Sequence, residues 1–170
     1  MTPKPRKKIQ RYIYKARPEK VFKALTDAKE LTRWFLKDAQ VQLKKGGKMK
    51  FVWSPKDKHE NKILELVPNK RLKISWPTMG WGGTPKVNTY VTFSLTPRGK
   101  YTLLQIEHTG FGMGEEWVMY YAGTYSGWTY YLLNLKSWLE HGIDLRDKIS
   151  ETVIVDNDSK KKDKRSKQKN

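Results

Sequence analysis

The sequence predicts an α+β fold, in which a meandering antiparallel sheet of about six to seven strands is followed by one long C-terminal helix. From Ala39 to Gly110 apolar residues recur at every second position, which is the period of a strand with one buried face. From Trp117 the period lengthens to that of a helix, and no charge occurs before Lys136. A chain of 170 residues, 37% of them hydrophobic, suits one domain with its own core.

Short elements are expected before the sheet. Residues 9–16 mix Ile and Tyr with charges and predict a first strand. Pro18 is favoured in the first turn of a helix, and apolar residues with helical spacing follow it. Asp27 predicts the N-cap of a second short helix that runs to Phe35.

Four runs of alternating apolar residues mark the clearest strands of the sheet. Gly-Gly, Ser-Pro, Pro-Asn and longer Gly- and Pro-rich turns separate them, as expected of an antiparallel meander. The runs are Met49, Phe51, Trp53; Leu72, Ile74, Trp76; Val87, Thr89, Val91, Phe93, Leu95; and Leu104, Ile106, His108.

The uncharged segment from Trp117 to Leu135 is long enough to raise the question of a membrane span. Its five tyrosines, two threonines, serine and asparagine are too polar for hydrocarbon, so we expect no membrane span. At about 100° per residue its larger side chains form one broad face of a helix. That face contains Trp117, Tyr121, Thr124, Tyr125, Trp128, Tyr131, Leu132, Leu135 and Leu139.

The chain is strongly basic, with a formal net charge of +18 and a pI near 9.9. We expect a basic N-terminal arm at residues 1–8, a globular domain at 9–150 and a lysine-rich, disordered tail at 151–170. Cysteine is absent and no apolar segment follows the charged N-terminus, which predicts a cytoplasmic protein without disulfides or a secretory signal.

Three segments together resemble the START-like, or SRPBCC, superfamily, in its subgroup named for the activator of the heat-shock-90 ATPase. They are ALTDAKELTRWF (24–35), NKILELVPNKRLKISW (61–76) and GWTYYLLNLKSWLEHG (127–142). The resemblance covers about Ile9 to Leu145 and implies a helix-grip fold, in which a curved sheet surrounds the C-terminal helix and leaves a cavity. The arm and the tail are not part of the pattern. The chain also shows no sign of the separate N-terminal domain of the eukaryotic co-chaperone.

Alternation and the helical face together predict which side chains surround such a cavity. Cavities for small ligands are mostly apolar with a few polar groups, and His108 and the tyrosines are the polar members of this set. The candidates are Trp34, Phe35, Trp53, Ile74, Trp76, Trp81, Phe93, Leu104, Ile106, His108, Phe111, Tyr121, Tyr125, Trp128 and Leu132. The glycine-rich loops SWPTMGWGGTP and TGFGMGEEW carry Met79, Trp81, Phe111 and Met113, which we expect to be exposed at a cavity entrance or in plain structural loops.

Gly123 and Gly127 lie at one edge of the aromatic face, where each costs about 1 kcal/mol of helix propensity relative to Ala. Two explanations remain open. Either a strand or loop approaches the helix closely at these positions, or the missing side chains leave space for a ligand.

Signals for catalysis are few. His59, His108 and His141 have no metal-ligand spacing, and no nucleophile elbow, P-loop or dinucleotide motif occurs, so we expect no metal and no cofactor. His108 with Glu107, Glu115 or Glu116 is the one candidate acid–base group, although a hydrogen-bonded core histidine explains it better. The sequence therefore favours a binding protein over an enzyme.

Three functions follow from these observations. The first is binding of a small hydrophobic, aromatic or lipid-like ligand between sheet and helix. The second, implied by the resemblance, is a stress-related module that interacts with a heat-shock-90 type ATPase through its basic surface, which suits an acidic partner. The third is nonspecific binding of nucleic acid through basic surface and tails.

The outer face of the long helix predicts a further contact. A surface helix normally presents charged residues to water, but this face carries small or weakly polar ones. We expect it either to meet a second copy in a two-fold dimer or a partner protein, or to be a small patch that is simply tolerated. Its residues are Val118, Ala122, Ser126, Thr129 and Leu133.

Overall fold

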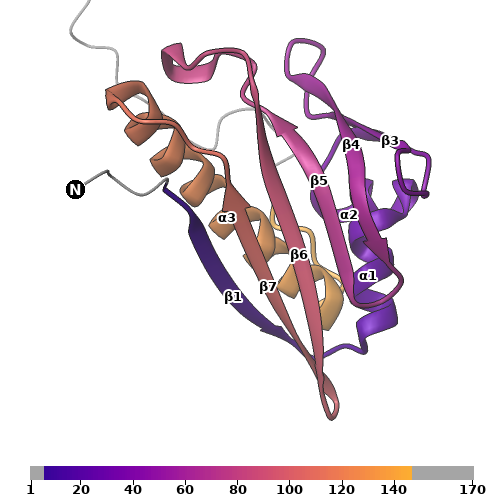
Figure 1. Cartoon of the computed structure of the whole chain (residues 1–170). Helices are drawn as coiled ribbons and strands as arrows, with labels where there is room; N and C mark the ends of the chain where they lie inside the picture. Colours follow the sequence, from indigo (N-terminus) through magenta and orange to yellow (C-terminus); the bar gives the residue numbers. More distant parts are fainter. Residues whose placement is uncertain (1–5, 147–170) are drawn as a thin grey trace, which may run out of the picture.

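The computed structural model describes residues 6–146, in which seven antiparallel strands form one sheet with the α-helices on one side of it (Figure 1). The strand order is β1-β7-β6-β5-β4-β3-β2. Strands β2 to β7 follow one another as antiparallel neighbours, and β1 is the edge strand next to β7. This arrangement confirms the predicted α+β helix-grip class. The elements are β1 (Lys8–Tyr14), α1 (Pro18–Thr26), α2 (Ala28–Trp34), β2 (Asp38–Val41), β3 (Lys48–Val52), β4 (Lys58–Val67), β5 (Arg71–Pro77), η1 (Trp81–Gly83), β6 (Asn88–Arg98), β7 (Tyr101–Thr109) and α3 (Glu115–His141).

The chain ends fall partly outside this description. The tail predicted at 151–170 and residues 1–5 of the predicted arm lie outside the described residues. Lys8, which the sequence assigned to the arm, is instead the first residue of β1 and pairs with His108 of β7. The first strand therefore starts one residue earlier than expected and ends at Tyr14.

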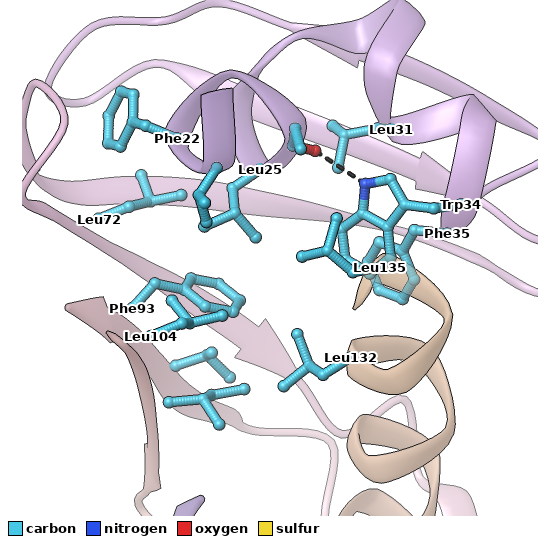
Figure 2. Packing of buried hydrophobic residues seen from close by; sticks show 14 of the residues in the cluster. Phe22, Leu25, Leu31, Trp34, Phe35, Leu72, Phe93, Leu104, Leu132 and Leu135 are labelled. Atoms are coloured by element: carbon cyan, nitrogen blue, oxygen red, sulfur yellow. Dashed lines mark hydrogen bonds between the residues drawn. The ribbon is translucent and has the colours of Figure 1, made fainter. Parts of the chain in front are cut away.

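The two short helices begin where the sequence predicts. Pro18 occupies the first turn of α1, and the Asp27 side chain accepts a hydrogen bond of 2.9 Å from the backbone N–H of Glu30 at the start of α2. At the end of α2, the indole Nε1 of Trp34 donates to the carbonyl of Ala24 at 2.9 Å (Figure 2). This bond ties α1 to α2 and satisfies the one polar atom of a buried tryptophan.

The core lies between the C-terminal half of α3, the sheet and the two short helices. Leu132 and Leu135 of α3 are fully buried, and Figure 2 shows Leu132 facing Phe93 and Leu104 of the sheet. Alternation along β3, β5, β6 and β7 gives the inner face, as predicted. Leucines fill this half because their side chains interdigitate without polar atoms that need partners.

The predicted inner face of α3 is correct at most positions and wrong at a few positions in both halves of the helix. Trp117, Trp128, Leu132, Leu135 and Leu139 are buried, but Tyr125 is 46% exposed. Tyr120 and Asn134, which lay outside the predicted face, are buried instead. Tyr120 is buried because the β7–α3 loop folds back and packs Phe111 on it, so α3 is covered from a second direction. Asn134 is buried because it bonds the carbonyl of Trp34 and the backbone N–H of Leu145.

The outer face of α3 carries no charge in its central part. Val118, Ala122, Ser126 and Leu133 are exposed, whereas the Thr129 hydroxyl accepts a hydrogen bond of 2.7 Å from Gln10 of β1. Within residues 6–146, no helix combines the length and the apolar character that crossing a bilayer requires.

The chain after α3 is fixed to the core by a polar cluster around Asn134. The Asn134 amide donates to the carbonyl of Trp34 at 2.7 Å and to the Asp144 carboxylate at 2.9 Å, and its oxygen accepts from the backbone N–H of Leu145 at 2.6 Å. Arg146 completes the cluster with hydrogen bonds to Asp144 and to the carbonyls of the α2 region. A buried amide is thus fully used to join α2, α3 and the segment that follows.

This cluster predicts an acid-sensitive contribution to stability. Partial burial raises the pKa of the Asp144 carboxyl, but hydrogen bonds from Arg146 and Asn134 outweigh it and hold the pKa at about 2, below the ordinary 3.8. A depressed folded-state pKa stabilises the fold above pH 4, and this stabilisation is lost as the pH falls toward 2. Between pH 5 and 2 the wild type should lose about 2 kcal/mol more of its free energy of unfolding than Asp144→Asn.

Urea denaturation at several pH values measures this difference. Glu65→Gln is the control, because Glu65 forms an exposed ion pair with Arg71 on the sheet and should leave the pH dependence close to that of wild type. Equal acid sensitivity of wild type and Asp144→Asn would contradict the assignment.

Candidate functional site

A cavity of about 280 Å³ lies between the N-terminal half of α3, the ends of β4 and β5, and the β5–β6 loop. Five of the residues that line it are aromatic and were predicted from the sequence: Phe35, Trp53, Trp76, Trp81 and Trp128. Because α3 carries no charge along this part, the wall that it contributes is uncharged. The cavity is therefore largely apolar.

Trp128 forms the floor. Its ring centroid lies 4.9 Å from that of Trp76 and 5.6 Å from those of Phe35 and Phe93. On the other side of Trp128 and Phe35, the leucine-rich core leaves a space of only about 10 Å³. These two rings separate a filled core from an open cavity.

The sheet side of the cavity is a cluster of rings around His59. Its imidazole centroid lies 4.7 Å from Trp76 and 5.1 Å from Trp53. Burial lowers the pKa of His59 to about 4, and the side chain of Asn61 offsets this only in part. His59 is therefore neutral near pH 7, and the wall carries no positive charge at this point.

The two glycines of α3 have different roles, and each matches one of the two explanations drawn from the sequence. A Cβ on Gly123 would overlap the indole of Trp81, so this glycine lets the β5–β6 loop pack directly on the helix. A Cβ on Gly127 would meet nothing within 4 Å. Gly123 thus permits a close approach, whereas Gly127 leaves space in the cavity.

The rim of the cavity is a short loop with unusual backbone geometry. Met79 and Gly80 have φ angles of 56° and 77°, and the Thr78 hydroxyl donates to the carbonyl of Pro85 to close the loop. Met79 and Trp81 are 56% and 53% exposed. A left-handed methionine is uncommon, and it is held here at the entrance of the cavity.

The remaining predicted residues lie away from the cavity wall. Trp34, Ile74, Phe93, Leu104, Ile106 and Leu132 belong to the buried core. His108, Phe111, Tyr121 and Tyr125 lie beside the cavity around the N-terminal part of α3. Phe111, expected to be exposed in its loop, is 3% exposed because it packs on Trp117 and Tyr120.

Sequence reasoning missed several lining residues, among them Asp57, His59, Thr78 and Tyr120, whereas Tyr131 was placed on the inner face of the helix but not among the cavity residues. His59 lies between charged residues in the segment KDKHENK, which obscures the alternation that would have pointed it inward. Tyr120 was placed outside the helical face because a helical wheel assumes one covering surface. The period-two spacing of His59, Asn61 and Ile63 was the available signal.

His108 is buried and neutral. Thr89 donates to the carbonyl of Trp76 at 2.8 Å, so its hydroxyl oxygen accepts the 2.7 Å hydrogen bond from Nε2–H of His108. Nδ1 of His108 then remains a buried acceptor without a partner. Burial, followed by the nearby charge of Lys8, holds the pKa of His108 well below its ordinary value. Within residues 6–146, the side-chain hydrogen-bond partner of His108 is Thr89, and His108 forms no ion pair with Glu107, Glu115 or Glu116.

The part of the chain that the structure describes contains no group of three or more His, Asp or Glu side chains placed to hold a metal ion. Its polar groups near the cavity are a neutral histidine, tyrosines, threonines and one exposed aspartate. Such groups suit hydrogen bonding to a ligand.

A curved antiparallel sheet around a long C-terminal helix, with a cavity between them, defines the START-like class of protein. The family model described as "Activator of Hsp90 ATPase homolog 1-like protein" matches residues 15–140, and the chain belongs to that family. No curated protein sequence matches the chain.

Solved structures share the fold. The solution structure of the Aha1 dimer from Colwellia psychrerythraea is 26% identical, with a TM-score of 0.69 over 81% of this chain and 98% of that one. CalU16 from Micromonospora echinospora is 27% identical, with a TM-score of 0.59 over 76% of this chain and 75% of that one. An HSP90 activator from Plasmodium falciparum is 23% identical, with a TM-score of 0.65 over 78% and 95% of the two chains, which shows the fold alone.

The packing of Trp81 on Gly123 predicts a selective effect of one methyl group. In Gly123→Ala the new Cβ overlaps the indole, so Trp81 and its loop should move outward while α3 gains up to about 1 kcal/mol of helix propensity. With 5-fluorotryptophan incorporated, the ¹⁹F resonance of Trp81, assigned by Trp81→Phe, should shift toward its solvent-exposed position. Gly127→Ala is the matched control, because its Cβ meets open space. An unshifted Trp81 resonance in Gly123→Ala would contradict the contact.

Proposed function

We propose that this protein binds a small, flat, largely apolar ligand, aromatic or lipid-like, in the cavity between the sheet and α3. The observation that carries the proposal is the contrast across Trp128, with about 10 Å³ of space on the core side and about 280 Å³ on the other. The core directly behind Trp128 and Phe35 is therefore filled, whereas the space in front of them is open and has aromatic walls. Small-molecule sites have this composition and shape.

Gly127 supports the same proposal. A glycine inside a helix costs about 1 kcal/mol, and here no neighbouring atom requires it. Keeping the cavity open is what this residue does for the structure. The rings of Trp53, Trp76 and Trp128 offer faces and edges at several angles, which suits a planar ligand.

A second candidate function is interaction with a heat-shock-90 type ATPase, and it rests on the family match. One relative of the fold carries the description HSP90 activator and another is an Aha1 dimer. The net charge of +18 suits an acidic chaperone, and the exposed, uncharged outer face of α3 suits a packed contact with a partner protein or a second copy. Val118, Ala122, Ser126 and Leu133 form that face.

The net charge of +18 supports one further property, a nonspecific attraction to nucleic acid and other polyanions. Binding of this kind depends on phosphate contacts and weakens steeply with salt. The exposed aromatic side chains of residues 6–146 are spread over α3, the β5–β6 loop and two strands, whereas single-strand binders place such rings together along the nucleic-acid path.

Filling the cavity should weaken ligand binding strongly without unfolding the protein. Gly127→Leu adds a side chain where nothing lies within 4 Å of the Cβ, and it raises helix propensity by up to about 1 kcal/mol. The uncharged dye N-phenyl-1-naphthylamine should bind the wild type saturably, and Gly127→Leu should weaken its binding about tenfold or more. Fluorescence titration measures the affinity, and thermal unfolding measures the stability.

Ala122→Leu is the matched control, since it adds apolar area on the exposed outer face of the same helix. Its dye affinity should equal that of wild type. Absence of saturable binding by wild type, or equal binding by Gly127→Leu, would remove the basis for the ligand proposal.

The outer face of α3 is tested by placing charge on it. Ala122→Lys with Ser126→Lys should disrupt any contact made there, because two ammonium groups would lose hydration in the interface. If the wild type is dimeric through α3, light scattering should show the double variant as a monomer. If the face instead meets the chaperone, the variant should lose the ability to raise the ATP turnover of a cognate heat-shock-90 protein. A variant that matches wild type in both measurements would exclude this face from either contact.

A further inference from the structure

Lys8 is buried in an unusual environment at the start of β1. The residue is 3% exposed, and its Nζ donates a hydrogen bond of 2.6 Å to the Thr124 hydroxyl of α3. The ring centroids of Phe111 and Tyr121 lie 5.6 Å from Nζ, and that of Tyr125 lies 5.9 Å away. Among residues 6–146, no carboxylate lies within 4 Å of this amine.

Polar groups next to Lys8 also lack partners. His108 faces Lys8 across the β1–β7 ladder, and its Nδ1 has no hydrogen bond. The hydroxyl of Tyr120, whose ring centroid lies 6.4 Å from that of His108, has none within hydrogen-bond geometry either. The structure thus gathers three incompletely satisfied polar groups at one place, although buried polar groups are normally paired.

This cluster adjoins the cavity. Tyr120 and Thr124 line the cavity wall, and Thr124 is the residue to which Lys8 is bonded. The side chain of Lys8 therefore lies directly behind the wall, one hydroxyl group away from the space. The aromatic faces around the amine favour its charged form, but they do not neutralise it.

A buried amine without a counter-ion is costly, because its charged form has lost its hydration. Burial accordingly lowers the pKa of Lys8 to about 7, so the amine changes charge near neutral pH. A nearby anion would restore the charged form. Within the described residues nothing supplies that anion, but a ligand in the cavity can.

We propose that Lys8, together with Tyr120 and Thr124, forms the polar end of the cavity and receives the carboxylate of an aromatic or lipid-like acid. This inference rests on the proposed function and specifies its ligand class. A carboxylate accepts hydrogen bonds through two oxygens, and the Lys8 ammonium and the Tyr120 hydroxyl are both donors. Small rotations of Thr124 and Tyr120 bring the donors to the cavity, while the apolar part of the ligand packs on the indoles of the floor and wall.

Paired ligands that differ in charge test the proposal. We would measure the binding of 2-naphthoate and of uncharged 2-naphthamide by titration calorimetry at pH 6.5. Wild type should bind the acid about tenfold or more tightly than the amide. An opposite charge next to an ionisable group shifts its pKa by one unit or more, and one unit corresponds to a tenfold change in an equilibrium constant. Lys8→Met should lose that preference and keep its affinity for the amide.

Lys7→Met is the matched control. It removes the same charge from the neighbouring residue, which is exposed. Its preference for the acid should equal that of wild type, so that the effect of net charge is separated from the effect of the Lys8 site.

The pH dependence of wild type gives an independent measurement that requires no variant to fold. Above pH 7 the free amine is neutral, and the acid must bind together with a proton, so the affinity for 2-naphthoate should fall as the pH rises from 7 to 9. The affinity for 2-naphthamide should not change. The titratable groups that face Lys8 are His108 of β7 and Tyr120, Tyr121 and Tyr125 of α3; Lys8→Met retains them all, so a pH dependence that this variant abolishes belongs to Lys8.

The outcomes separate the two proposals. If wild type binds acid and amide equally and without pH dependence, the Lys8 inference is overturned and the cavity proposal stands. If wild type binds neither naphthalene compound nor the neutral dye, the proposed function fails and the Lys8 inference fails with it. A preference for the acid that persists in Lys8→Met would show that general surface charge, and not this site, attracts the carboxylate.

Discussion

One helix has to cover the inner face of a seven-stranded sheet, because α3 is the only long helix within residues 6–146. A helix is about 10–12 Å wide with its side chains, which is narrower than the space enclosed by a curved sheet of this size. At one end α1 and α2 supply the missing volume, and leucines of α3 complete a filled core. At the other end residues 6–146 supply only the short 3-10 helix η1, so large rings line the sheet and α3, and a cavity remains between them.

The fold could be predicted from the sequence because its signals are local. Alternation along β3, β5, β6 and β7, the Asp27 cap and the uncharged helical segment each depend on a few neighbouring residues, and each was found where expected. Trp128 was likewise assigned inward, because leucines and aromatics one turn away share its face. The family resemblance covers the same span and is confirmed by the family match at residues 15–140.

The details of the site could not be read from the sequence in the same way. Tyr125 was placed inside and Tyr120 outside because the fold-back of Phe111 onto α3 is a contact between loop and helix that no periodicity encodes. Lys8 was assigned to a solvated arm, since a lysine among basic residues is usually exposed. Its burial depends on three rings from distant parts of the chain. His59 was missed because its charged neighbours dominate the local pattern.

The pairing of β1 with β7 also sets the order in which the chain can assemble. During synthesis β1 emerges before the other strands of residues 6–146, and its partner among them begins at Tyr101, roughly 5 to 20 seconds later at ordinary rates of translation. Until then β1 is an unpaired edge, and the charges of Lys7, Lys8 and Arg11 protect it from pairing with other chains. The lysine that is buried beside the cavity in the finished fold thus acts earlier as a gatekeeper against aggregation. The sheet is complete, and Lys8 reaches its place behind the cavity wall, only when β1 pairs with β7.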